Sequence, residues 1–331
     1  MRAIVLDAPG AELHERELSD PEPGPGEVVV AVEACGVCRT DLHVIDGELA
    51  DPALPLILGH QAVGRVAEVG EGASLEVGQR VGVPWLASTC GECDRCREGR
   101  ENLCPRARFH GYTRDGGYAE RIAVDSRFAL PLESDAAASA LAPLLCAGLI
   151  GYRALRMCAD AERVGLFGFG SSAHLICGLL AMQGREPYAF TRDGDADGQR
   201  FARSLGAVWA GGSSESPPVE LDAAIIFAPA GELVPAALAR IRPGGVVVCA
   251  GIHMSDVPSF PYELLWHERS IRSVANLTRR DGLEFLPLAI ERGLTPVVTT
   301  YPLSEASRAL DDLRAGRVEG SAVLELGSDP V

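Results

Sequence analysis

The sequence of 331 residues contains no lysine, so all 30 of its basic residues are arginine. Without an ε-amine the protein cannot form a lysine Schiff base, anchor pyridoxal phosphate or use a phosphate-loop lysine. Nothing in the sequence explains this absence. It nevertheless excludes several large classes of enzyme.

Positive charge is scarce as well: the sequence has 30 basic and 46 acidic residues, which gives a net charge of −16. Nucleic acids and anionic membrane surfaces both select for a basic face, so we expect neither as a partner. The sequence also lacks an apolar run of about 20 residues, the length that a membrane-spanning helix needs. Its first residues lack the apolar stretch of a secretory signal, and the expected location is the cytoplasm.

Ten cysteines are present, and in the cytoplasm clustered cysteines more often bind metal than form disulfides. Four of them, Cys90, Cys93, Cys96 and Cys104, lie within 15 residues. Four thiolates can surround one zinc ion completely. An iron–sulfur cluster is the alternative, since Pro105 follows the last cysteine, but the ferredoxin pattern has three residues before that cysteine rather than seven. We therefore expect a structural zinc.

A second constellation consists of Cys38 and His60, which together form an incomplete zinc shell. His60 alone would be an ordinary loop histidine, but Cys38 and the neighbouring four-cysteine loop favour a metal ligand. Cys146 is the candidate for the third ligand. Two sulfurs and one imidazole leave the fourth position of a zinc ion open to a substrate, as in catalytic zinc sites.

A glycine-rich turn lies between an apolar run and a helical segment. Gly168 permits a tight turn, Gly170 allows the close approach of a pyrophosphate, and Ala173 lets the helix pack closely on the strand. Ser171 and Ser172 begin that helix, where backbone N–H groups are free to bind phosphate. The turn therefore predicts a dinucleotide site.

The chain changes character along its length. In the first 130 residues, short segments with the pattern of β-strands are separated by turns, which predicts a small β-barrel. From residue 163 onward apolar runs alternate with helical segments, which predicts a doubly wound parallel sheet of the α/β class. We expect residues 1–140 and 283–331 to form the first domain, because a tail of strand, helix and strand rejoins it, and residues 141–282 to form the second. The expected strands of the sheet are 164–167, 188–191, 223–228, 246–250 and 270–277, and the expected helices are 173–184, 198–205, 233–240 and 282–292.

The segment Gly59-His60-Gln61-x2-Gly64-x-Val66-x2-Val69-Gly70 resembles the signature of zinc-dependent alcohol dehydrogenases in the medium-chain dehydrogenase/reductase superfamily. The run from Cys38 to His43, the four-cysteine loop and the glycine-rich turn also occur in that family's order, over essentially the whole chain. The resemblance implies a GroES-like catalytic domain and a Rossmann dinucleotide-binding domain. It also implies reversible hydride transfer between a small primary or secondary alcohol and a nicotinamide cofactor, in a homodimer or homotetramer.

The resemblance assigns the metal ligands and a proton relay. Cys38, His60 and Cys146 fall on the ligands of the catalytic zinc, and the four-cysteine loop falls on those of a structural zinc. Two zinc ions per subunit are therefore implied. Thr40 matches the hydroxyl that takes the proton of the substrate, and His43 matches the outer end of that relay.

Three further residues match positions with known roles in the family. Asp41 matches the carboxylate that orients the zinc-bound imidazole. Arg39 falls where the family often places a cation against the cofactor pyrophosphate. Trp85 resembles the aromatic side chain that narrows the pocket in members acting on small alcohols.

Two positions depart from the family pattern. Gln61 replaces the glutamate that follows the zinc histidine, so we expect a difference in turnover or zinc affinity. At the end of the second strand, Thr191 replaces the acid that binds the ribose 2′-OH, and Arg192 could neutralise a 2′-phosphate. Asp193 keeps NAD open, so the sequence favours NADP over NAD without excluding NAD.

Two alternative functions can be compared with this one. A polyol or amino-alcohol dehydrogenase of the same superfamily often uses an acidic third zinc ligand and a roomier pocket, and Cys146 and Trp85 are evidence against it. A sensor that binds dinucleotide and zinc without catalysis would lack a ligand or relay residue of the open site. The three ligands and two relay residues of the open site are all present: Cys38, His60, Cys146, Thr40 and His43. The predicted partner is therefore a small alcohol or aldehyde that serves as the substrate.

Overall fold

The computed structural model describes residues 1–327 and divides into two compact units. The first comprises Met1–Cys146, Asn276–Ile290 and the chain from Thr295 onward, and the second comprises Ala147–Ala275 and Glu291–Leu294. The sequence-based borders lay after residues 140 and 282, whereas the chain passes between the units after residues 146 and 275. The stretch around the first border is uniformly rich in alanine and leucine, so no local signal marks it. Residues 328–331 of the predicted first domain lie outside the described part of the chain.

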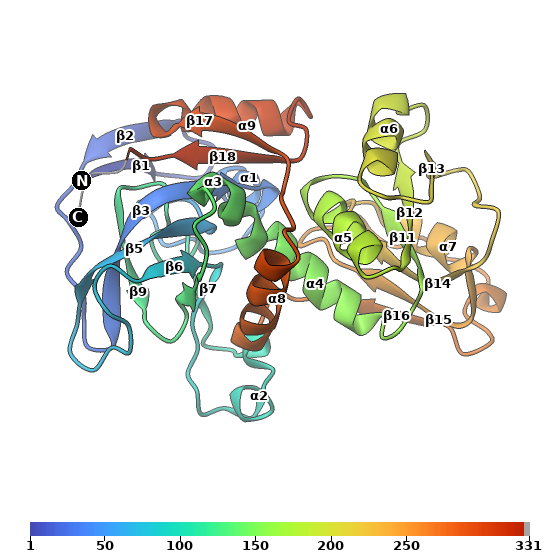
Figure 1. Cartoon of the computed structure of the whole chain (residues 1–331), viewed down its shortest axis with the longest axis horizontal. Helices are drawn as coiled ribbons and strands as arrows, with labels where there is room; N and C mark the ends of the chain where they lie inside the picture. Colours follow the sequence, from blue (N-terminus) through green and yellow to red (C-terminus); the bar gives the residue numbers. More distant parts are fainter. Residues whose placement is uncertain (328–331) are drawn as a thin grey trace. The chain divides into compact units, whose positions relative to one another are not determined.

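The first unit is built around a sheet whose longest strand is β3 (Glu27–Val37) (Figure 1). Valine favours extended backbone, and Val28 and Val30 are fully buried in the core. β18 (Ser321–Glu325) pairs antiparallel with β3, so the C-terminal segment rejoins this unit as predicted. The strand order is β10-β6-β5-β3-β18-β17, and β9 also pairs with β3. The other strands are β5 (Ala62–Val69), β6 (Arg80–Val83), β9 (Arg121–Asp125), β10 (Leu130–Pro131) and β17 (Val298–Pro302).

Two smaller sheets and several helices complete the first unit. One sheet has the order β2-β1-β4, and the other pairs β7 with β8. Helix α9 (Ala306–Arg314) connects the parallel strands β17 and β18 and buries one apolar face against the core. The small strands are β1 (Arg2–Leu6), β2 (Leu13–Glu17), β4 (Leu56–Ile57), β7 (Leu86–Ser88) and β8 (Arg108–Phe109). The remaining helices are α1 (Arg39–Ile45), α2 (Asp94–Arg97), η1 (Glu101–Leu103), α3 (Ala138–Leu141), η2 (Ala142–Leu145), η4 (Leu303–Glu305) and α8 (Arg279–Glu291), whose last residue belongs to the second unit.

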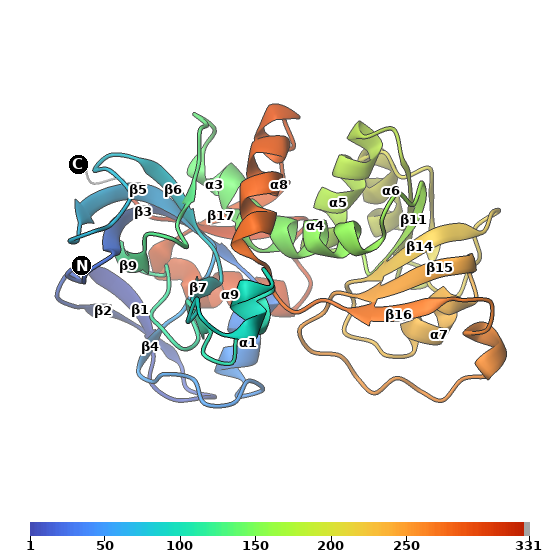
Figure 2. The same ribbon diagram turned by 90° about the horizontal axis from the view of Figure 1, so that it is seen from below.

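The second unit contains a six-stranded, fully parallel sheet in the order β13-β12-β11-β14-β15-β16. Figure 2 shows β14, β15 and β16 of this sheet side by side. From β11 the chain first adds β12 and β13 on one side of the sheet and then β14, β15 and β16 on the other, which is the arrangement of the predicted Rossmann fold. One strand, β13 (Trp209–Gly212), was missed because its two glycines have little strand propensity. The other strands are β11 (Arg163–Phe167), β12 (Glu186–Thr191), β14 (Leu221–Ile226), β15 (Ile241–Cys249) and β16 (Ser270–Ser273). The helices are α4 (Ala147–Met157), α5 (Ser171–Met182), α6 (Ala196–Ser204), α7 (Leu233–Leu238) and η3 (Tyr262–Leu264).

Among the described residues, no individual helix combines the length and the apolar composition needed to cross a membrane. One bent pair, Ala138–Leu145 with Ala147–Met157, meets those two criteria when its helices are taken together.

Candidate metal centres

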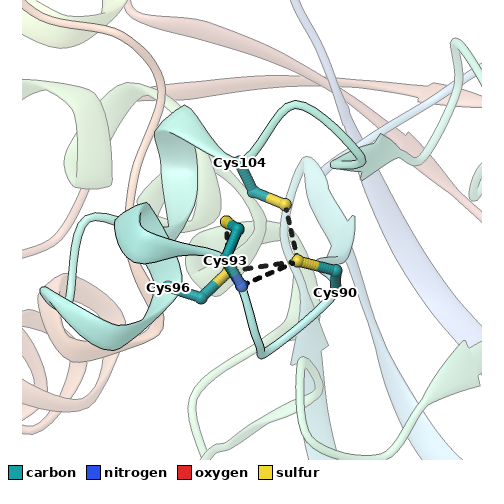
Figure 3. A group of neighbouring side chains, drawn as sticks. All are labelled: Cys90, Cys93, Cys96 and Cys104. Carbon is teal, nitrogen blue, oxygen red and sulfur yellow. Dashed lines mark hydrogen bonds between the residues drawn. The ribbon is translucent and has the colours of Figure 1, made fainter.

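The four-cysteine loop lies between β7 and β8 and brings its sulfur atoms together (Figure 3). The Sγ atom of Cys90 lies 3.9 Å from that of Cys96 and 3.5 Å from that of Cys104, and Cys93 and Cys96 are 3.5 Å apart. Four sulfurs bound to one zinc ion at about 2.3 Å would be about 3.8 Å apart. The donor set therefore fits a closed zinc site.

Local backbone geometry shapes this loop. Gly91 and Gly99 both have a φ of +71°, a left-handed conformation that residues with a Cβ rarely adopt. The backbone N–H groups of Glu92 and Cys93 face the Cys90 thiolate and lower its pKa to about 6. A thiolate at neutral pH is the form that binds zinc.

A second cluster joins residues from three distant segments of the first unit. Cys38 caps the N-terminus of α1, His60 follows β4, and Cys146 ends η2. Their ligand atoms all lie within 4.8 Å of one another, and the two sulfurs are 3.9 Å apart. The structure thus brings together the three residues that the sequence singled out.

The fully buried carboxylate of Asp41 orients this cluster. Its Oδ2 accepts the backbone N–H of Cys38 at 2.9 Å, and its Oδ1 accepts Nδ1–H of His60 at 3.2 Å. This contact leaves Nε2 of His60 buried and without a hydrogen-bond partner. A buried, unpaired ring nitrogen beside two thiols is a donor set that suits zinc.

Negative charge accumulates around the second cluster. Burial by itself would lower the pKa of His60, but the Asp41 carboxylate and the Cys38 thiolate raise it to about 10. A hydrogen bond from Cys146 holds the pKa of the Cys38 thiol well below its ordinary value, against the effect of burial. A site that stabilises a thiolate beside a carboxylate attracts a cation.

The predicted relay residues lie on α1. Thr40 is buried, with its Oγ1 3.8 Å from the Cys38 sulfur. Nδ1 of His43 contacts the carboxylate of Glu48, a partner that the sequence reasoning missed. Arg39 is exposed at the first position of the helix, where it is free to meet a ligand.

Two predicted residues flank His60. The ring centroid of Trp85 lies 6.2 Å from that of His60 and 4.6 Å from that of Phe109, so aromatic rings line this side of the centre. Gln61 is buried, and its amide packs on Gly36, where an added Cβ would come within 2.7 Å of Oε1. The amide is therefore packed in the protein interior.

The glycine-rich turn joins β11 to α5 in the second unit. Gly168 has a φ of +86°, and a Cβ there would approach the backbone nitrogen of Ala228 to 2.8 Å. Gly170 caps α5 with open space beside it, and Ala173 is fully buried. Ser171 and Ser172 form the first turn of α5, where backbone N–H groups can meet an anion.

The residues after β12 divide into a buried and an exposed group. Thr191 is buried, and its hydroxyl donates to the backbone oxygens of Arg192 at 3.0 Å and Gly211 at 3.3 Å. The side chain of Arg192 is exposed, as is that of Asp193, whose Oδ1 accepts the N–H of Ser214 at 3.1 Å. Arg192 is thus the accessible cation at this strand end.

Sequence reasoning missed Tyr118, whose hydroxyl donates to Oδ2 of Asp41 at 3.1 Å. The two residues are 77 positions apart, so no spacing rule connects them. The available signal was the run Asp115-Gly116-Gly117-Tyr118, whose paired glycines indicate close backbone packing.

Comparisons with known proteins identify the family and the fold. The family model described as "Alcohol dehydrogenase GroES-like domain" matches residues 24–134. The chain is 47% identical over 313 residues to "Probable alcohol dehydrogenase AdhA" of Mycobacterium tuberculosis, covering 92% of this chain and 90% of that protein. It is 34% identical over 341 residues to an alcohol dehydrogenase of Geobacillus stearothermophilus, covering 99% of this chain and 100% of that protein. The structure of CAD from Helicobacter pylori complexed with NADP(H) has the same fold, with a TM-score of 0.89 and 22% identity over 98% of this chain and 97% of that chain.

Proposed function

The chain belongs to the zinc-type alcohol dehydrogenases of the medium-chain dehydrogenase/reductase superfamily, and from this membership we propose that it holds two zinc ions per subunit. Cys38, His60 and Cys146 hold the catalytic ion, and the four-cysteine loop holds the structural one. The observation that carries the first assignment is the buried, unpartnered Nε2 of His60 in a cluster with two thiol sulfurs. A zinc ion with three protein ligands keeps one position open and acts there as a Lewis acid toward an alcohol oxygen.

The residues on α1 remove the proton of the alcohol. Thr40 lies beside Cys38, and its hydroxyl accepts this proton while it gives up its own; His43 then passes a proton outward to water. The contact between His43 and Glu48 places a carboxylate at the end of this path. Asp41 keeps the His60 ring in the tautomer whose Nε2 is free for the metal.

The hydride acceptor is a nicotinamide dinucleotide bound at the turn between β11 and α5. The backbone N–H groups of Ser171 and Ser172 face its pyrophosphate, and the exposed Arg39 is the cation that the family pattern assigns to the same group. NADP is favoured over NAD, because Thr191 offers no carboxylate to the ribose and the exposed Arg192 can pair with a 2′-phosphate.

The preferred substrates are small primary and secondary alcohols and the matching aldehydes and ketones. The ring of Trp85 lies beside His60, is backed by the rings of Phe109 and Tyr112, and limits the size of a substrate on that side. We also place the protein in the cytoplasm, since six thiol ligands require a reducing compartment.

Metal analysis of two variants tests the zinc assignment. We expect two zinc ions per subunit in the wild type and one in Cys38→Ala and His60→Ala, with turnover abolished in both variants. The remaining ion should withstand dialysis in both variants, because the four-cysteine loop is intact. One ion per wild-type subunit, or full turnover in either variant, would contradict the proposal.

Steady-state kinetics at matched concentrations of substrates and of cofactors test the proposed substrate class and the preference for NADP over NAD. We expect kcat/KM to be higher for short alcohols than for polyols and amino alcohols, and higher with NADP than with NAD. Arg192→Ala should lower kcat/KM for NADP about tenfold or more and leave that for NAD nearly unchanged, since only NADP has a 2′-phosphate. A polyol as the best substrate would favour the alternative dehydrogenase class.

A further inference from the structure

The run Asp115–Tyr118 lies along the segment Ile57–Gly59 that leads into His60. The backbone N–H of Gly116 donates to the oxygen of Ile57 at 2.8 Å, and that of Tyr118 donates to the oxygen of Leu58 at 2.9 Å. In return, the N–H of Ile57 donates to Oδ1 of Asp115 at 3.0 Å. Successive hydrogen bonds therefore fasten the approach to a zinc ligand onto this run.

The ring of Tyr118 packs directly against the residue that precedes His60. A Cβ on Gly59 would lie 2.3 Å from Cδ1 of Tyr118, closer than atoms can approach. Gly59 has a φ of +94°, so its conformation also requires glycine. Because the ring and the Gly59 backbone are in direct contact, a shift of the Tyr118 ring would also shift the backbone next to His60.

The hydroxyl of Tyr118 also contacts this centre, through Asp41. It donates to Oδ2 of Asp41 at 3.1 Å, and both side chains are fully buried. The other donors to this carboxylate are the N–H groups of Cys38 and Gly59 and the ring of His60. Within the described part of the chain, Asp41 therefore accepts from four donors. Tyr118 is the one among them that is neither a candidate zinc ligand nor next to one in sequence.

We infer that Tyr118 is a positioning residue of the zinc site: its hydroxyl fixes Asp41, and Asp41 fixes the ring of His60. The inference rests on the proposed catalytic zinc. Loss of the hydroxyl leaves the Asp41 carboxylate with one donor fewer in a buried site, so the carboxylate turns toward its remaining donors and the His60 ring is held less firmly. Partners that orient a metal-bound histidine contribute roughly 10- to 100-fold to metal affinity.

Zinc release from the intact protein measures this effect. Wild type and Tyr118→Phe are mixed with a chromogenic chelator, and Cys38→Ala identifies which phase of release belongs to the Cys38 site. Tyr301→Phe is the matched control, because the hydroxyl of Tyr301 donates at 2.9 Å to a carboxylate of the same unit, Asp312, that belongs to neither candidate metal cluster. Thermal unfolding of all variants is recorded in parallel.

The expected result is release from the Cys38 site about tenfold faster in Tyr118→Phe, with the four-cysteine site unchanged and neither phase changed in Tyr301→Phe. If Tyr118→Phe loses thermal stability like Tyr301→Phe but releases zinc at the wild-type rate, the inference is overturned and Tyr118 is only structural. A wild type that holds a single zinc would instead overturn the proposed function.

A second variant covers the case in which Tyr118→Phe fails to fold. Incorporation of 4-fluorophenylalanine at position 118 fills the volume of the hydroxyl but provides no proton to donate. The same acceleration of zinc release supports the inference, and a wild-type release rate refutes it.

Discussion

At the scale of single residues, the environment of each side chain decides its role. His60 is tied to Asp41 through one ring nitrogen, which leaves the other nitrogen for a metal. His110 is equally buried, its Nδ1 meets the backbone oxygen of Pro84 at 2.9 Å, and its Nε2 also has no hydrogen-bond partner. Among the described residues, however, His110 belongs to no cluster of potential metal ligands, and burial lowers its pKa to about 4. The same residue type is thus a candidate metal ligand in one place and a neutral core residue in the other.

Gln61→Glu is the substitution that restores the family's residue. The amide and the carboxylate have the same shape, so the packing on Gly36 is kept while a buried negative charge appears next to His60. We expect zinc release and kcat each to change by less than tenfold. Gln79→Glu makes the same chemical change at a half-buried turn position and should alter neither quantity. Complete loss of activity in Gln61→Glu would refute this expectation.

At the scale of elements, an ion pair anchors the four-cysteine loop to helix α8 within the first unit. Arg279, the first residue of α8, donates through Nη2 at 2.7 Å and through its backbone N–H at 2.8 Å to the Glu101 carboxylate of η1. Its guanidinium also lies 4.7 Å from the ring centroid of Phe128. Because Glu101 is only 7% exposed, its carboxylate depends on this partner.

Arg279→Gln should therefore destabilise the first unit by about 1–3 kcal/mol, the value typical of losing hydrogen bonds to a charged group. Zinc release from the four-cysteine loop should accelerate, because η1 loses its anchor. Arg280→Gln is the control: its pair with Glu284 is exposed and should contribute less than about 0.5 kcal/mol. Chemical denaturation of both variants measures the difference, and equal effects would contradict the prediction.

At the scale of the whole molecule, the sheet of the second unit ends in an open edge. Among residues 1–327, β16 pairs only with β15, and Ile271 on it is 39% exposed. Although β16 also carries the exposed Arg272, an edge strand presents unpaired backbone N–H and C=O groups that can pair with a second copy. Family membership and this edge together support a homodimer or homotetramer.

Sedimentation of the wild type should thus give two or four times the 34.9 kDa subunit mass. Ile271→Lys should shift the population toward the monomer, because a charge at an edge opposes strand pairing. Val77→Lys, at another exposed apolar position in the first unit, should leave the mass unchanged. A monomeric wild type would exclude this mode of assembly.

The sequence alone determined the fold class, the family and the residue types of the candidate site. Its signals were local: the spacing of the four cysteines, the glycines of the turn before α5, and the alternation of strands with helices. Each of these signals depends on residues that are close together in the chain, and backbone geometry limits the conformations that such residues can adopt. The same local signals missed β13, a short strand with two glycines, because it forms only through pairing with β12.

The tertiary structure decided what surrounds those residues. It brings Cys146 to Cys38 across 108 positions, Tyr118 to Asp41 across 77, and Arg279 to Glu101 across 178. Contacts over such separations arise from the packing of whole elements, and no short pattern of residues encodes them. The sequence therefore named candidate metal ligands, and the fold provided the carboxylates and hydroxyls that orient them.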